Sequence, residues 1–111
     1  MDFTFSDDQL LFQEEVKKFL VNEGTPEKIR ALWETESGRS DDLWQAMASM
    51  GLTGLTVPEE FGGMGMNAVD FVLLAEACGF VALPEPLVET VLVAVPLINE
   101  LSVDAVKFAW L

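Results

Sequence analysis

The chain has 111 residues, a length that suits one domain with a core of its own. Nineteen acidic residues against six basic ones give a formal net charge of −13, which excludes nucleic acid and anionic membranes as partners because both repel such a surface. Half of the residues are hydrophobic and the mean hydropathy is +0.31, so we expect the chain to lend apolar surface to something else.

The residue types that are missing or isolated exclude several kinds of chemistry. There is no histidine, which removes histidine-based acid–base catalysis and metal ligation. The one cysteine, Cys78, has no partner for a disulfide or zinc site and is interpreted as a small buried hydrophobe. Glu59 and Glu60 are expected to be solvated in a turn, and residues 62–65 lack the strand and lysine of a phosphate-binding loop. We therefore predict no catalytic, cofactor-binding or metal-binding residue in this chain.

Two helices are predicted over the first 38 residues. Ser6 and Gln9 form a capping box at the start of the first, and acidic residues follow where the helix dipole favours them. Gly24 ends this helix. Thr25 is the N-cap of the second helix, which we expect to end at Gly38.

The third and fourth helices flank a turn-rich connection. Ser40 begins the third helix and Gly51 closes it. Residues 52–66 contain a proline and four glycines, so no helix is predicted there. Their one strand-like stretch, residues 52–57, is short. Asn67 caps the fourth helix, which Gly79 ends. Its core side carries Phe71, Leu74, Ala75 and Cys78.

The fifth predicted helix is apolar nearly all round, which is typical of a buried helix. It runs from about Glu85 towards Ile98, and Pro96 is expected to kink or end it. Ser102 begins a sixth helix that reaches the last residues of the sequence. With no convincing strand and no internal repeat, the chain is predicted to be all-α, an up-down bundle of about six helices in a single domain, residues 1–111.

Three stretches of the sequence together resemble the N-terminal domain of acyl-CoA dehydrogenases. The most specific is Met50 to Gly63, M-G-L-T-G-L-T-V-P-E-E-F-G-G, which is similar to the family segment L-G-L-x-G-L-x-V-P-E-E-Y-G-G. The opening F-S-D-D-Q at residues 5–9 is similar to the family helix cap F-S-E/D-x-Q. Residues 76–79 and 107–111 resemble the E-E-x-G and K-x-x-Y-L-P stretches. The resemblance covers essentially the whole chain.

The resemblance implies the N-terminal part of a longer FAD-dependent enzyme, without its middle β-domain and its C-terminal helical domain. Such an enzyme converts an acyl-CoA thioester to the trans-2-enoyl-CoA in fatty acid or lipid metabolism. Its flavin-contacting residues and catalytic base lie in the missing domains, so the fragment alone is expected to bind no FAD and to be inactive. The implied partners are acyl-CoA, the remaining domains, and other subunits of a homo- or hetero-oligomer.

The resemblance also implies that this domain walls the acyl-chain cavity and supports the flavin domain. Val88, Leu92 and Val95 are spaced i, i+4, i+7, so we expect them to share the face of the fifth helix that lines the acyl pocket. Ordinary core packing is the alternative for these three residues. For the whole chain, a stand-alone helical interaction module without catalysis and a related flavin oxidase or monooxygenase stay open as alternatives.

The N-terminus and the apolar runs of the sequence indicate the cellular compartment of the protein. The acidic N-terminus resembles neither a signal peptide nor an arginine-rich transit peptide. The longest apolar run, residues 87–98, is interrupted and shorter than the roughly 20 residues of a membrane span. We therefore expect a cytoplasmic protein that does not enter the membrane.

Overall fold

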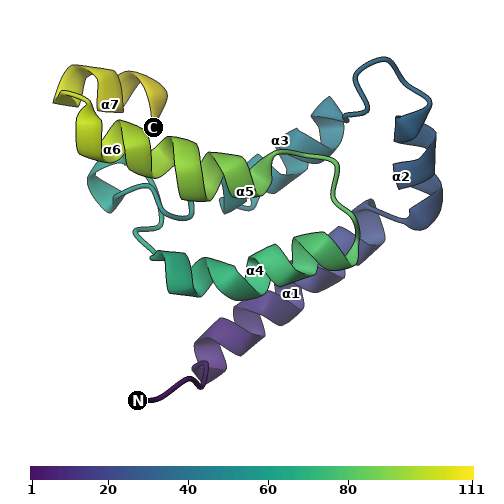
Figure 1. The fold of residues 1–111 in the computed structure, drawn as a ribbon, viewed down its shortest axis with the longest axis horizontal. Coiled ribbons are helices and arrows are strands. Elements are labelled where there is room, and N and C mark those ends of the chain that lie inside the picture. The colour runs from purple at the N-terminus through teal and green to yellow at the C-terminus, as the bar shows by residue number, and fades with distance from the viewer. The chain divides into compact units, whose positions relative to one another are not determined.

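The computed structural model describes all 111 residues, and every regular element in it is a helix (Figure 1). The absence of strands confirms the predicted all-α class. None of the helices is long and apolar enough to cross a membrane. Six α-helical segments follow one another: α1 (Asp7–Glu23), α2 (Pro26–Trp33), α3 (Asp41–Ser49), α4 (Ala68–Phe80), a composite helix from α5 (Leu87–Glu89) to α6 (Val95–Leu101), and α7 (Asp104–Trp110).

The chain divides into two compact units whose segments alternate along the sequence. Unit 1 comprises Met1–Arg39 and Val69–Pro84, and unit 2 comprises Ser40–Ala68 and Glu85–Leu111. Unit 1 therefore contains α1, α2 and nearly all of α4. Unit 2 contains α3, the composite helix and α7. Each unit is assembled from segments that are far apart in the sequence.

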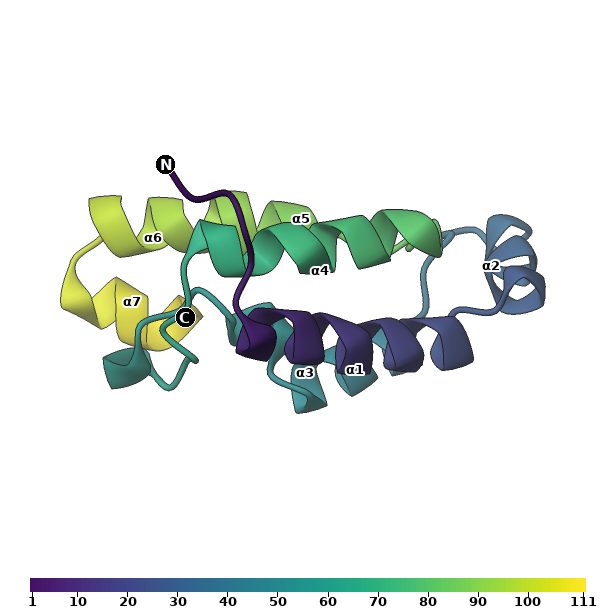
Figure 2. The same ribbon diagram turned by 90° about the horizontal axis from the view of Figure 1, so that it is seen from below.

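In unit 1, α1 and α4 run parallel, side by side (Figures 1 and 2). Ser6 Oγ accepts the Gln9 N–H and the Gln9 side-chain oxygen accepts the Ser6 N–H, which is the predicted capping box. The amide nitrogen of the same Gln9 side chain donates to the Asp70 carboxylate at 2.8 Å, and Gln13 donates to the Leu73 carbonyl. Gln9 thus both caps α1 and ties it to α4. The buried residues of the two helices are Val16, Leu20, Phe71, Leu73, Leu74, Ala77 and Cys78.

The second helix is shorter than the glycine pattern predicts. It begins where expected but ends at Trp33 rather than near Gly38. The Thr35 hydroxyl donates to the Leu32 carbonyl at 2.6 Å and accepts the Gly38 N–H at 3.0 Å. A side chain that bonds the backbone locally competes with the helical pattern, so Thr35 ends the helix before the glycine is reached.

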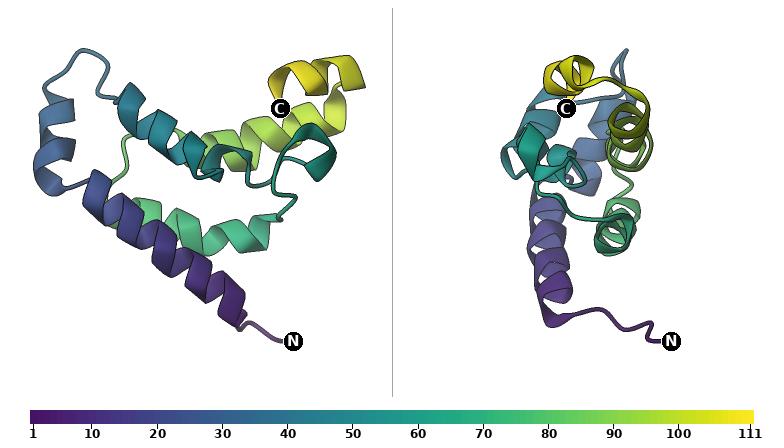
Figure 3. Two further views of the ribbon diagram at one scale, coloured as in Figure 1. Left: turned by 180° about the vertical axis from the view of Figure 1, so that it is seen from behind. Right: turned by 90° about the vertical axis from the view of Figure 1, so that its left-hand side faces the viewer.

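In unit 2, α7 folds back antiparallel to α6 (Figures 2 and 3). The ring of Phe108, on α7, packs edge-to-face against Phe61, with the two centroids 4.8 Å apart. Ser102 was expected to begin the last helix. It lies instead directly after α6 as its C-cap, because α6 continues to Leu101, and α7 begins at Asp104 without a side-chain cap.

One continuous helix runs from Leu87 to Leu101 (Figure 3). Between α5 and α6, the segment η3 (Thr90–Ala94) is a single π-helical stretch, in which the backbone bonds span five residues. The expectation that Pro96 kinks or ends the helix is corrected, because the helix passes through this proline. Proline lacks an N–H and crowds the carbonyl four residues earlier, and the wider π turn lies just where that conflict arises.

The composite helix is not buried on every side, which corrects the second expectation for it. Val93 and Leu97 are each 53% exposed, and Leu101 is 78% exposed. The all-round apolar sequence therefore produces one buried face and one apolar face that the chain leaves uncovered.

Candidate functional site

The three residues expected to line an acyl pocket all lie on the composite helix, but with different burial. Val88 and Leu92 are half-buried, and Val95 is only 6% exposed. The fully buried line of this helix is formed by Leu87, Val91 and Val95, at a spacing of four residues. A π turn holds more residues than an α turn, so positions that are four apart come onto one face here. Val95 therefore shares the buried line, while Val88 and Leu92 flank it.

The hydrogen bonds around η3 explain how the π turn is held. The Val95 N–H donates to the Thr90 carbonyl, five residues back. The Thr90 hydroxyl donates to the Pro86 carbonyl at 2.7 Å. The Val91 carbonyl accepts the Thr56 hydroxyl, also at 2.7 Å, from a residue 35 positions earlier in the chain. The buried face of the helix is thus fixed by a side chain outside it.

Thr56 belongs to residues 52–66, which fold into a compact loop with two short 3-10 turns, η1 (Leu52–Gly54) and η2 (Glu59–Phe61). The short strand-like stretch of residues 52–57 forms no strand, in agreement with the predicted all-α class, because the segment bends back on itself. Three backbone bonds close the loop, as the N–H groups of residues 64, 65 and 66 donate to the carbonyls of residues 54, 57 and 55. The side chains of Leu52, Leu55 and Val57 are buried.

The start of the composite helix is tied to α3 within unit 2. Ser40 caps α3 by accepting the Leu43 N–H, as predicted. The Glu85 carboxylate, which is 5% exposed, accepts the Ser40 N–H at 2.7 Å. Charge-assisted bonds of this kind are stronger than neutral ones, so Glu85 fixes the beginning of the apolar helix.

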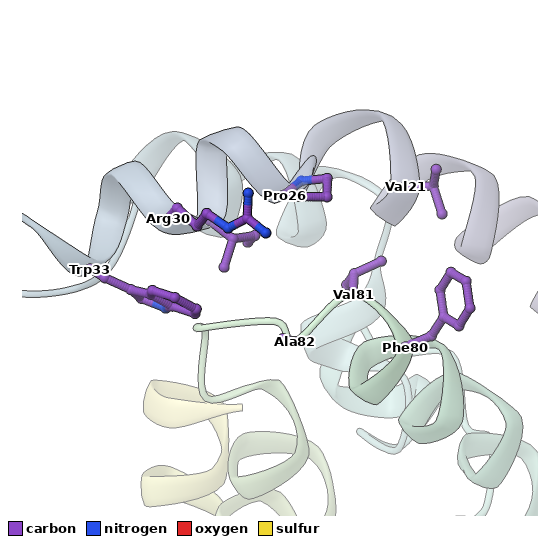
Figure 4. A pocket seen from close by; sticks show the side chains of 8 residues that line it. Val21, Pro26, Arg30, Trp33, Phe80, Val81 and Ala82 are labelled. Atoms are coloured by element: carbon purple, nitrogen blue, oxygen red, sulfur yellow. The ribbon is translucent and has the colours of Figure 1, made fainter.

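Unit 1 carries a separate apolar groove of about 390 Å³ (Figure 4). Trp33 and Phe80 lie at opposite ends of it, with Arg30 between them. The Lys17 ammonium lies 4.3 Å from the centre of the Phe80 ring, a cation–π contact. The full lining is Val21, Pro26, Ile29, Arg30, Trp33, Phe80, Val81 and Ala82.

The groove offers apolar walls and one guanidinium, but no nucleophile and no base. None of the three expected acyl-pocket residues lines it. The sequence analysis predicts the helix that carries Trp33 but predicts no groove. The available signal was a pair of large aromatic residues at helix ends, Trp33 and Phe80, which both remain largely exposed.

The three side chains that the sequence offered as possible reactive groups lie in ordinary structural surroundings. Burial raises the pKa of the Cys78 thiol to about 11, which keeps it protonated and confirms its interpretation as a buried hydrophobe. Glu59 and Glu60 are both exposed, as expected for a solvated turn. No group of three or more cysteine or acidic residues is placed to hold a metal ion.

The residues present do not fit an FAD molecule. A dinucleotide pyrophosphate is commonly held by the N–H groups at a helix N-terminus. The first turns of α1 to α4 instead carry acidic side chains, which repel phosphate: Asp7, Asp8, Glu27, Asp41, Asp42 and Asp70. The glycines at 62 and 63 follow a 3-10 turn rather than a strand, so they do not form a phosphate-binding loop either.

Comparison with known proteins gives a consistent result over nearly the whole chain. Residues 6–111 match the family model described as "Acyl-CoA dehydrogenase, N-terminal domain". The chain is 33% identical over 95 residues to acyl-CoA dehydrogenase IpdE2 of Mycolicibacterium smegmatis, covering 85% of this chain and 30% of that protein. It is 34% identical over 83 residues to the mitochondrial isovaleryl-CoA dehydrogenase of Arabidopsis thaliana, covering 71% and 20%.

A further relative is the (2S)-methylsuccinyl-CoA dehydrogenase of Cereibacter sphaeroides, 38% identical over 72 residues that cover 63% of this chain and 13% of that protein. The chain thus spans less than a third of the length of each of these relatives. No solved structure matches the chain significantly.

Proposed function

Because this chain belongs to the acyl-CoA dehydrogenase family and matches the N-terminal domain of its members, we propose that it is part of a flavoenzyme that oxidises an acyl-CoA thioester to the trans-2-enoyl-CoA. The chain provides neither an FAD site nor a catalytic base, so the reaction requires the complete protein. Its own part is to wall the acyl-chain cavity and to support the flavin domain. Acyl-CoA is the substrate, and the enzyme works as a homo- or hetero-oligomer.

The composite helix is the observation that carries this proposal. Two of its apolar side chains, Val88 and Leu92, are only half-buried, and Val93 and Leu97 are left about half exposed. A fatty-acyl tail has no hydrogen-bonding groups along its length, so a purely apolar wall suits it. Each methylene that leaves water for such a wall adds about 0.8 kcal/mol of transfer free energy. A helix that keeps apolar surface open in this chain is therefore the element best suited to the tail.

The experiment is the substitution Leu92→Phe in the complete enzyme. If Leu92 lines the cavity, the larger side chain fills the space of the last methylenes and shortens the preferred acyl chain. Each excluded methylene is expected to lower kcat/KM for the longer substrates by about 10-fold or more. Activity is measured against a ladder of acyl-CoA lengths, together with thermal melting and flavin content, which should both stay near those of the parent enzyme.

Leu20→Phe is the matched control, because Leu20 has no exposed surface and belongs to α1 in unit 1 rather than to the composite helix. Overpacking at a core position costs about 1–3 kcal/mol, so this variant should melt earlier without a change in chain-length profile. If Leu92→Phe behaves in the same way as this control, Leu92 is a core residue and the cavity assignment is wrong.

A further inference from the structure

The composite helix contains a backbone carbonyl that no N–H within the helix can reach. In a regular α-helix the Val91 carbonyl would accept the N–H of Val95, four residues later. Here that N–H donates to the Thr90 carbonyl instead, because the segment is π-helical. The π pattern would give Val91 the N–H of residue 96, but residue 96 is a proline and has none.

Water cannot readily take the place of the missing donor, because Val91 has no exposed surface. A buried carbonyl without a partner destabilises the conformation that creates it. The Thr56 hydroxyl supplies the partner at 2.7 Å. Thr56 is itself held in place by the closed loop of residues 52–66, whose backbone bonds and buried leucines leave the hydroxyl little freedom.

The same helix has a second available arrangement. If the Val95 N–H moved to the Val91 carbonyl, the segment would become a regular α-helix and would no longer need Thr56. The extra residue of the π turn would be lost, which rotates the following residues by about 100° relative to those before residue 90. The Pro96 ring opposes this arrangement because it crowds the Leu92 carbonyl. The hydroxyl of Thr56 and the ring of Pro96 therefore both favour the π form.

We propose that Thr56 is a positioning residue for the acyl pocket: by holding the Val91 carbonyl it keeps residues 90–94 in the π form and sets which side chains of α6 face the acyl chain. The inference rests on the proposed function of the composite helix. Thr56 touches no substrate in this role. It acts through the register of the helix, and hence on the depth and shape of the wall.

The test compares Thr56→Val, which keeps the shape but removes the donor, with Thr56→Ser, which keeps the donor, in the complete protein. Crystal structures show whether the Val95 N–H bonds to Thr90 or to Val91. Kinetics with acyl-CoA esters of increasing length show whether the wall has changed. We expect Thr56→Val to shift the bond to Val91 and to change the ratio of kcat/KM between short and long substrates by about 10-fold, mainly through KM. Thr56→Ser should retain the parent register and profile.

The outcomes separate this inference from the function on which it rests. An unchanged register and profile in Thr56→Val would overturn the role of Thr56, while Leu92→Phe would still test the pocket. A changed register with an unchanged profile would overturn both, because the helix would then not line the pocket. If Thr56→Val does not fold, the double variant Thr56→Val/Pro96→Ala is used, since it removes both groups that favour the π form and gives residue 96 an N–H. A Val95 N–H that bonds to the Val91 carbonyl, together with a changed chain-length profile, supports the inference, and a retained π register with the parent profile overturns it.

Discussion

Gly63 lies against the backbone of Val57 in the closed loop of unit 2. A Cβ at this position would overlap both the carbonyl oxygen and the Cβ of Val57, and neither is the far end of a flexible side chain. We therefore predict that Gly63→Ala lowers the free energy of unfolding by about 3 kcal/mol, through overpacking against rigid atoms. Urea unfolding followed by circular dichroism measures this change.

Gly79 was expected to end α4 but lies within it, since α4 continues to Phe80. It provides the matched control, because a Cβ at this position would meet no atom within 4 Å outside its own helical backbone. Gly79→Ala is expected to raise the free energy of unfolding by about 0.5–1 kcal/mol, since alanine loses less backbone entropy in a helix. The two Gly→Ala changes should thus have opposite signs. Similar losses at both positions would contradict the close approach of Gly63 and Val57.

The buried Cys78 thiol allows a second prediction at this scale. With a pKa of about 11, only about one thiol in a thousand is ionised at pH 8, so iodoacetamide should modify the folded protein at least tenfold more slowly than the urea-unfolded protein. The folded pKa exceeds the ordinary value of 9.0, so burial of the neutral thiol stabilises the fold fully below pH 9. That contribution is lost as the pH rises towards 11. Rapid modification of the folded chain would show that Cys78 is accessible.

At the scale of elements, Thr56 and Pro96 should be energetically coupled. Thr56→Val removes the donor that the buried Val91 carbonyl has in the π form, and the Pro96 ring opposes the α form, so the substitution should cost about 1–3 kcal/mol of stability. In a Pro96→Ala background the ring is gone and residue 96 has an N–H, so the Val91 carbonyl can be satisfied without Thr56 and the same substitution should cost less. A double-mutant cycle on the free energy of unfolding is expected to give a coupling of about 1 kcal/mol. Additive effects would mean that the two residues do not share the Val91 carbonyl.

The starts of the first three helices could be predicted from the sequence, because a side-chain cap depends on residues two or three positions apart, whereas the start of α7, which has no side-chain cap, could not. The caps at Ser6, Thr25 and Ser40 all form as expected. The end of α2 was misplaced because Thr35 competes for the Leu32 carbonyl before Gly38 is reached. Capping glycines are read easily from a sequence, whereas this local competition by a hydroxyl is not.

The π turn could not be predicted, because its partner Thr56 lies 35 residues away. The unpredicted π turn also explains why the three candidate pocket residues do not share one face of the helix. An α-helical spacing of i, i+4, i+7 grouped Val88 and Leu92 with Val95, whereas the π turn groups Val95 with Leu87 and Val91 in the buried line. Pattern rules assume one period per helix, and a local change of period shifts every face that follows it.

At the scale of the whole molecule, large apolar residues remain exposed in both units. In unit 1 these include Trp33 and Phe80, and in unit 2 they include Leu101, Phe108 and Trp110. These exposed residues favour association between copies, whereas the net charge of −13 opposes it. We therefore predict that the isolated 111-residue chain associates with itself and binds a hydrophobic dye. The association should increase as salt screens the charge, between about 0.05 and 0.5 M.

Sedimentation velocity across protein concentration and salt measures this association. Trp33→Ser and Trp110→Ser each remove one exposed side chain, from unit 1 and unit 2 respectively, so a comparison of the two identifies the surface responsible. A strictly monomeric chain at high salt, with no dye binding, would show that these exposed residues do not form an adhesive surface.

The alternation of the two units along the sequence has a consequence for synthesis. The last residue of unit 1 is Pro84, but residues 40–68 of unit 2 are synthesised before it and cannot finish folding until residues 85–111 follow. At typical elongation rates of 5–20 residues per second, this interval lasts about 1–5 s. During that time Leu52 and Leu55, fully buried in the finished chain, have no completed core around them. The nascent chain therefore presents a transient apolar segment to ribosome-associated chaperones, and a pause in translation near residue 84 would prolong that exposure.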